Sequence, residues 1–202
     1  MTTRVIYFLL TLVLFSYCNN SDNKSKADKK AIVIDIQPFN GVTKAQTEYV
    51  FNELKKVYPL IEIKKNIALP EFAYYSARNR YRADSLIKFL NTLTITGHKT
   101  IGLTNNDIST TKDNITDWGI MGLGFCPGNS CIASTFRLSK TETNMQLFKV
   151  AIHELGHTFG LPHCNVKSCF MRDAEGSNPT NEEKDFCVKC KSFLVNKGWH
   201  LK

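Results

Sequence analysis

The chain carries the segment His153-Glu154-Leu155-Gly156-His157-Thr158-Phe159-Gly160-Leu161-Pro162-His163. On a helix, His153 and His157 project from one face one turn apart, where two imidazoles can bind one Zn²⁺. Gly160 can end that helix in a left-handed conformation, and Pro162 discourages further helix. The turn that follows can return His163 as a third ligand. Three protein ligands leave a fourth position for water, which is typical of a catalytic rather than a structural zinc site.

Glu154 follows the first predicted ligand directly, so it can lie beside the metal without binding it. Zinc lowers the pKa of its bound water to roughly 7, and a neighbouring carboxylate can take the proton. The most natural reaction is hydrolysis of a peptide bond. The alternative is an amphipathic helix with incidental histidines. The added glycine and the third histidine argue against this alternative, because H-E-x-x-H alone is much less specific.

Further fixed positions extend the pattern to H-E-x-x-H-x-x-G-x-x-H-C-x4-C-x-M…C-x-x-C, namely Cys164, Cys169, Met171, Cys187 and Cys190. From Ile152 to about Cys190 this string resembles the archaemetzincins, a zinc-peptidase-like family within the metzincin clan. The resemblance implies an α/β (α+β) fold, with a metzincin-like zincin domain and a mixed, partly parallel sheet. It also implies an active-site helix and a C-terminal segment stapled by a zinc site.

The resemblance further implies a second, structural zinc held by Cys164, Cys169, Cys187 and Cys190, and therefore two Zn²⁺ per chain. The spacing agrees, because four thiolates form a closed tetrahedral site. Cys164 adjoins His163, so such a site would also position the third catalytic ligand. Two disulfides, or a redox-active Cys187/Cys190 pair, are the alternatives. By resemblance Met171 lies in the turn beneath the catalytic metal, although a methionine there can also simply fill the core.

The first thirty residues are predicted to direct export and membrane attachment. Residues 1–17 contain Arg4 and an apolar run that is too short for a transmembrane helix, as in a signal peptide. Cys18 resembles the lipid-attachment site of a bacterial lipoprotein, although Tyr17 is bulky where a small residue is usual. An uncleaved anchor or an ordinary secretory signal is the alternative. Residues 18–30 form a polar tether that should be disordered. We therefore expect residues 31–202 to be lipid-anchored at the bacterial cell envelope, on the periplasmic side or the cell surface.

Composition limits the choice of partners. Residues 31–202 suit one domain with a sizeable core. The formal net charge is +8, but no nucleic-acid-binding motif or base-stacking pattern accompanies it. We therefore expect a monomer whose partners are a peptide or protein substrate and a membrane, and no nucleic acid.

Cys126 and Cys131 are the remaining two of the seven cysteines. They flank Pro127-Gly128-Asn129-Ser130, which is a strong turn signal. A hairpin there would bring the two thiols together, and an exported protein could oxidise them. The sequence therefore predicts a Cys126–Cys131 disulfide, with two free buried thiols as the alternative.

Strand and helix patterns alternate along the domain. Strands are predicted over 31–36, 60–67 and 100–104, two more within 115–138, and helices over 43–58, 83–93 and 143–159. Strands that alternate with helices at these lengths imply crossover connections and a partly parallel sheet. By resemblance to metzincins, residues 132–137 form an edge strand along the cleft, with Ile132, Ala133, Ser134, Thr135 and Phe136 as the substrate-binding residues. An extended peptide could pair with this strand.

The leading functional hypothesis is a zinc-dependent peptidase with Glu154 as general base and then proton shuttle. The alternative is a zinc-scaffolded peptide-binding module with little or no turnover. Glu154 argues against that alternative, because a scaffold needs the metal ligands but not the base. A thiol redox protein that uses Cys187 and Cys190 would leave the three histidines unexplained.

Overall fold

A computed structural model describes residues 31–202 of the chain. The predicted signal peptide (1–17), the tether (18–30) and the predicted lipidation site Cys18 lie outside these residues. Across the described range, no helix combines the length and apolar character needed to cross a membrane. The helices are α1 (Lys44–Lys55), α2 (Ala83–Leu93), α3 (Thr143–Phe159) and α4 (Val188–Val195). The strands are β1 (Val33–Pro38), β2 (Ile61–Ile63), β3 (Tyr74–Tyr75), β4 (Arg80–Arg82), β5 (His98–Thr104), β6 (Ile108–Lys112), β7 (Ile115–Ile120), β8 (Gly122–Gly124) and β9 (Ser130–Ser134).

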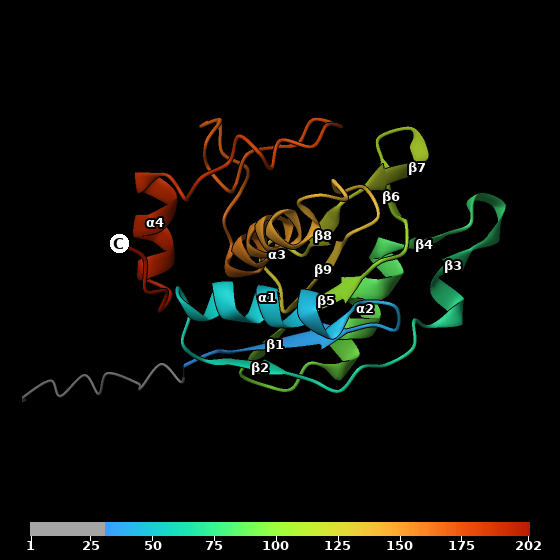
Figure 1. Cartoon of the computed structure of the whole chain (residues 1–202), viewed down its shortest axis with the longest axis horizontal. Helices are drawn as coiled ribbons and strands as arrows, with labels where there is room; N and C mark the ends of the chain where they lie inside the picture. Colours follow the sequence, from blue (N-terminus) through green and yellow to red (C-terminus); the bar gives the residue numbers. More distant parts are fainter. Residues whose placement is uncertain (1–30) are drawn as a thin grey trace, which may run out of the picture.

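The larger sheet forms the framework of the molecule. Its five strands run in the order β2-β1-β5-β9-β8, and all neighbours are parallel except β8, which is antiparallel to β9. Parallel neighbours need crossover connections, and α1 and α2 supply two of them. In Figure 1, α1 and α3 lie on one side of the sheet and α2 lies on the other. This arrangement confirms the predicted mixed, partly parallel α/β fold.

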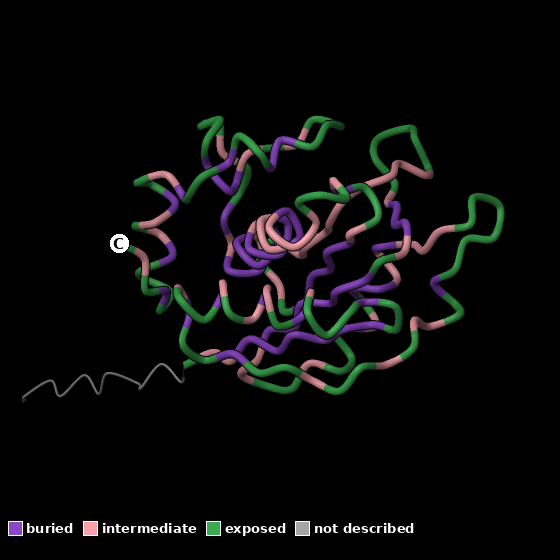
Figure 2. Tube along the Cα trace, viewed as in Figure 1, coloured by how far each residue is buried: buried purple, intermediate pink, exposed green. Residues whose placement is uncertain are grey.

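Two apolar cores fill the spaces between the sheet and its helices. On one face, Ile34 of β1 packs in a cluster with Val50 of α1 and Leu147 of α3. On the other face, Leu90 of α2 joins a cluster with Ile132 of β9. Figure 2 shows α3 as a largely buried helix in the middle of the molecule. Side chains carried by this helix are therefore held in place by packing on several sides.

Helices α2 and α3 begin and end at the predicted residues. The strand predicted over 60–67 is shorter, because β2 ends at Ile63. Of the remaining residues, Ile67 pairs with Phe39 in an isolated bridge. The Gln37 side chain donates to the Lys65 carbonyl at 2.8 Å, so a side-chain amide replaces the backbone ladder there.

The edge strand predicted over residues 132–137 is wrong. β9 ends at Ser134, and it lies between β5 and β8, so both of its backbone edges are paired. Thr135 and Phe136 belong to the turn that follows. The outer strand is β8. After β8 the chain turns back through residues 125–129 and continues into β9, which lies between β8 and β5. Chain order misled the prediction, because the last strand before the active-site helix is not the last strand of the sheet.

A smaller sheet with the order β3-β4-β6-β7 lies beside the larger one. Buried ion pairs tie it to the segment after β9. The Asp107 carboxylate accepts from Arg137 at 2.8 Å and pairs with Arg80 at 3.0 Å. Arg80 also pairs with Asp117 of β7 at 3.2 Å. These contacts hold the β6–β7 hairpin against the body of the domain.

The C-terminal tail packs on the end of α3. Trp199 is 1% exposed, and its ring lies 5.4 Å from Phe159 and 5.4 Å from Tyr58 between ring centroids. Phe186 contacts it on a third side at 5.9 Å. Aromatic clusters of this size contribute strongly to a core. The segment after the histidine motif is therefore folded back onto the active-site helix by apolar packing as well as by cysteines.

Candidate active site and metal centres

Helix α3 carries the first two histidines and ends where the sequence predicts. Gly160 adopts φ 102°, a left-handed conformation that disfavours residues with a Cβ. Leu161 N–H then donates to the Gly156 carbonyl at 3.0 Å, which satisfies one of the free carbonyls of the last turn. This reversal brings His163 back beside His153 and His157. One nitrogen from each of the three imidazoles lies within 4.8 Å of the others.

Backbone carbonyls orient the two helical histidines. His153 Nδ1 lies 2.6 Å from the Phe170 carbonyl, and His157 Nδ1 lies 2.7 Å from the Leu161 carbonyl. A carbonyl only accepts, so each Nδ1 carries the proton and each Nε2 is left with a lone pair. The two Nε2 atoms are nevertheless 3.0 Å apart. Two lone pairs at this distance cannot bond to each other, whereas a shared cation satisfies both.

The charge states of these histidines also suit a metal. Burial, together with the neighbouring His157, lowers the pKa of His153 to about 3. Burial likewise lowers the pKa of His157. Both rings are therefore neutral near pH 7, which is the ligand form. His163 is more open, and its Nδ1 lies 3.3 Å from the Asp173 carboxylate, an outer partner of the kind that orients metal-binding histidines. The donor set therefore fits a zinc ion.

Glu154 lies next to these ligands in a slot formed by β8. The residue is 7% exposed, and burial raises the pKa of its carboxyl group to about 8. A Cβ at Gly122 would lie 2.6 Å from one Glu154 carboxylate oxygen, and a Cβ at Gly124 would lie 3.3 Å from the other. The two glycines therefore provide the space that the carboxylate occupies. Sequence reasoning missed both, and the Gly-Leu-Gly spacing was the available signal.

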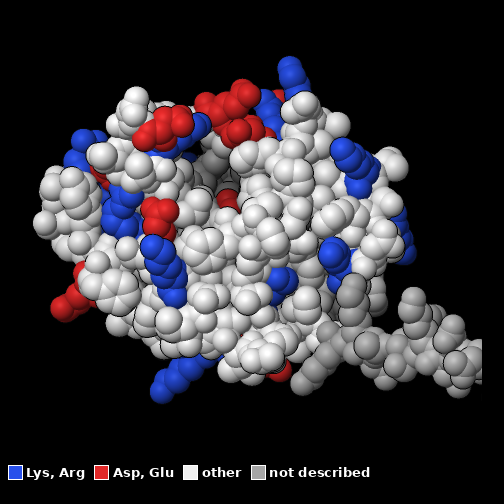
Figure 3. All heavy atoms as spheres, turned by 180° about the vertical axis from the view of Figure 1, so that it is seen from behind, with Lys and Arg blue, Asp and Glu red and all other residues white. Residues whose placement is uncertain are grey.

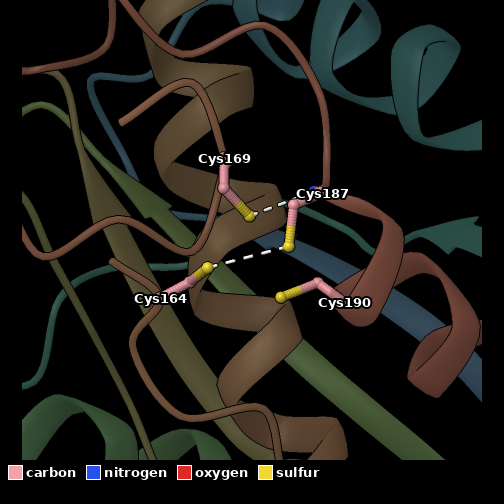
Figure 4. Close-up of side chains that lie close together, drawn as sticks. All are labelled: Cys164, Cys169, Cys187 and Cys190. Carbon is pink, nitrogen blue, oxygen red and sulfur yellow. Dashed lines mark hydrogen bonds between the residues drawn. The ribbon is translucent and has the colours of Figure 1, made fainter. Parts of the chain in front are cut away.

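The four predicted cysteine ligands form a second cluster, shown in Figure 4. Their sulfurs all lie within 4.8 Å of one another, and Cys164 Sγ is 3.7 Å from Cys187 Sγ. A tetrahedral zinc site with 2.3 Å bonds separates its sulfurs by roughly 3.8 Å. A disulfide would need about 2.05 Å. The cluster therefore fits a structural zinc ion, and neither disulfides nor an oxidised Cys187/Cys190 pair is present among the described residues.

A cleft of about 670 Å³ opens over the histidines and Glu154. Its walls come mainly from the segment from β6 to β8, from helix α3, and from the segment from Arg172 to Glu183. In the space-filling view of Figure 3 the molecule is hollowed, and Asp and Glu side chains gather around the opening with one acidic side chain inside it. A chain of substrate could therefore reach the histidine cluster from solvent.

Comparison with known proteins agrees with this geometry. The profile of Peptidase family M54 matches residues 29–196. The chain belongs to this family, the archaemetzincins. Archaemetzincin from Methanopyrus kandleri is 32% identical over 135 residues, which cover 65% of this chain and 75% of that protein. Archaemetzincin from Haloquadratum walsbyi is 27% identical, over 81% of this chain and 99% of its own length. The family is one of zinc-dependent metallopeptidases, which act on peptides or proteins.

Solved archaemetzincin structures share the fold. The Methanopyrus kandleri crystal structure superposes with a TM-score of 0.72 at 24% identity, and covers 84% of this chain and 97% of that one. The Archaeoglobus fulgidus archaemetzincin, crystallised in complex with malonate, gives a TM-score of 0.69 at 25% identity. It covers 80% of this chain and 99% of its own.

Met171, the methionine of the archaemetzincin motif, is fully buried beneath α3. Its sulfur lies directly against Gly156, at a position where any Cβ would collide with it. Gly156 lies between His153 and His157 on the helix. Met171 therefore packs under the turn that carries both histidines, and it occupies core space in doing so.

The predicted Cys126–Cys131 disulfide is wrong, because both thiols are free in the structure. Cys131 is buried within β9, and its partner across the strand pair is Gly124. Cys126 is exposed and donates to the Leu161 carbonyl at 3.3 Å. The turn is real, but strand pairing has already ended at Gly124, so the two cysteines are not opposite each other.

Substitution of Gly122 by alanine tests whether the slot in β8 positions the Glu154 carboxylate. The added methyl group would meet Glu154 Oε1 at 2.6 Å and Val150 Cγ1 at 2.8 Å, so the carboxylate must move. We expect kcat on a cleavable peptide to fall by roughly 100-fold while the zinc content is unchanged, because small displacements of catalytic groups cost about this much. The melting temperature of the same variant is the control for a general loss of structure. Full activity of Gly122→Ala would show that the slot does not position Glu154.

Proposed function

We propose that the chain is an active zinc-dependent peptidase in which Glu154 is the general base. One observation carries the proposal: the unprotonated nitrogens of His153 and His157 face each other beside a buried carboxylate in an open cleft. A protein that only held a metal would have no use for that carboxylate. The zinc-dependent peptidase family to which the chain belongs supports the same assignment.

His153, His157 and His163 would hold the catalytic zinc. Zinc bound there supplies a Lewis acid, which polarises a carbonyl group and acidifies water. Glu154 accepts a proton from the attacking water and later gives it to the leaving amine. Burial raises the pKa of this carboxyl group, which favours retention of the proton between the two steps.

The substrate would bind along β8 rather than β9. β8 is the outermost strand of its sheet and lines the cleft together with Met121 and Ile120. One backbone edge of β8 is therefore available for an extended peptide, which could pair with it by strand addition. The same strand carries the two glycines against which Glu154 lies. We infer that β8 positions both the bound substrate and the Glu154 carboxylate.

The second zinc in this proposal is structural. Cys164, Cys169, Cys187 and Cys190 would hold it in a closed site without a position for water. Cys164 follows His163 directly, and Cys169 precedes Phe170, whose carbonyl orients His153. We therefore propose two zinc ions per chain, one catalytic and one structural.

Metal removal and reloading test the peptidase proposal. The full chain is incubated with a mixed peptide library, and products are identified by mass spectrometry. We expect cleavage that stops after treatment with a zinc chelator and returns when zinc is added. A zinc-loaded protein that cleaves nothing but retains particular peptides would instead support the peptide-binding module.

A further inference from the structure

Glu183 is a buried carboxylate with no assigned role in the peptidase chemistry. The residue is 4% exposed and lines the cleft together with His153 and Glu154. Within residues 31–202 its side chain makes no hydrogen bond and no salt bridge, although its backbone carbonyl accepts from Lys149 at 2.6 Å. A buried carboxylate without a partner is costly, so such groups are normally paired or functional.

The charged groups nearest Glu183 do not neutralise it. Lys149 of α3 donates to the carbonyls of Thr180 and Glu183 at 2.6 Å each, and Arg172 pairs with Glu182 at 2.6 Å. Burial, with a smaller contribution from Glu182, outweighs the lowering by Lys149 and Arg172 and raises the pKa of Glu183 to about 7. Neither cation forms an ion pair with the Glu183 carboxylate, which leaves that carboxylate free to pair with a cation from a ligand.

Among the described residues, none of the other cations along the cleft hydrogen-bonds to the Glu183 carboxylate, and Lys149 is held only by backbone carbonyls. Arg137 is bound by Asp107 at 2.8 and 3.0 Å, Arg172 is bound by Glu182, and Lys112 lies over the Trp118 ring at 5.3 Å from its centroid. The Glu183 carboxylate is therefore open to a cationic group from a ligand. A ligand that enters this part of the cleft gains most by bringing a cation.

The wall that carries Glu183 is built rigidly. The Gln146 side chain of α3 accepts from Asn178 at 3.0 Å and donates to Asn181 at 2.8 Å. Together with Lys149, it fastens residues 178–183 to the active-site helix at several points. A side chain held by such a frame keeps its position when a ligand binds, which favours selectivity.

We propose that Glu183 selects peptides that place a lysine or arginine side chain in the cleft. This inference rests on the peptidase function proposed above and names its substrate class. Asp173 and Glu175 line the same cleft, and Figure 3 shows acidic side chains near the opening.

Cleavage specificity is the first test. The full chain and its Glu183→Gln variant are given the same peptide library, and the residues around each cleaved bond are compared. We expect lysine and arginine to be enriched at one subsite for wild type. The enrichment should fall by roughly ten- to a hundredfold in Glu183→Gln, because a buried charge partner is lost. Glu142→Gln is the matched control, since that side chain is exposed, has no salt bridge among the described residues and does not line the cleft.

Peptide retention is the second test, and it does not depend on turnover. Zinc-loaded Glu154→Gln protein is compared with Glu154→Gln/Glu183→Gln protein for retention of paired peptides that differ only by lysine or norleucine. We expect preferential retention of the lysine peptide only when Glu183 is present. The preference should grow as pH rises from 6 to 8, because the carboxyl group, with a pKa of about 7, becomes charged over this range. It should be flat in the glutamine variant.

The two tests separate the two proposals. Cleavage by wild type without a preference for cationic residues, or retention that ignores residue 183, would overturn the role of Glu183 and leave the peptidase proposal standing. Retention that depends on Glu183, in a protein that cleaves nothing, would overturn the peptidase proposal and support the cationic site.

Discussion

Replacing Glu154 by glutamine is expected to lower kcat/KM on a cleavable peptide by about 10²–10⁴-fold. Glutamine has nearly the same shape and can occupy the slot beside Gly122 and Gly124, but it cannot accept a proton from water. The zinc content should stay at the wild-type value, because Glu154 is not among the three clustered histidines. Activity is measured with a peptide identified from the library, and zinc is measured by elemental analysis of the same samples.

Glu142→Gln provides the control for this experiment. Glu142 is exposed at the start of α3 and does not line the cleft. Its substitution makes the same chemical change as Glu154→Gln. It should leave both activity and zinc content unchanged. Equal cleavage by wild type and Glu154→Gln would mean that another group takes the proton. Loss of zinc from Glu154→Gln would mean that the carboxylate supports the metal site instead.

Replacing Cys187 by serine is expected to remove the structural zinc and to disturb the catalytic site with it. Metal binding at a closed thiolate site contributes directly to folding stability. A loss of several kcal/mol in a domain of this size lowers the melting temperature by on the order of 10 °C. The catalytic zinc should also bind about 10–100-fold more weakly, because Cys164 and Cys169 adjoin residues that position His163 and His153. Zinc per chain and thermal unfolding are the two measurements.

Cys126→Ser is the matched control for Cys187→Ser. Cys126 is a free, exposed thiol outside the four-cysteine cluster, and serine keeps a donor for the Leu161 carbonyl. It should retain both zinc ions and the wild-type melting temperature. An unchanged zinc count and melting temperature in Cys187→Ser would contradict the structural zinc site.

Local patterns in the sequence predicted the histidine site because its geometry is local. The four-residue spacing of His153 and His157, and the left-handed turn at Gly160, depend only on helix geometry and on backbone freedom. The cysteine ligands are farther apart in the chain, and they were predicted from a family motif rather than from geometry. Both clusters are brought together in the structure.

Features that depend on long-range packing could not be predicted from local sequence patterns. β8 is three residues long and contains two glycines, so it carries little strand signal, and its position outside β9 follows from sheet assembly. The register that separates Cys126 from Cys131 has the same origin. Glu183 lies in a polar stretch and looks like a surface residue, and only the folded wall around it shows that it is buried.

The turn Cys169-Phe170-Met171 serves three purposes within three residues. Its first residue contributes a sulfur to the cysteine cluster, its second offers the carbonyl that orients His153, and its third packs under Gly156. The order of the histidine site therefore depends on residues outside the histidine motif. A designer who grafts it onto another helical scaffold would need to bring this turn, and the cysteines that anchor it, to obtain a comparably ordered centre.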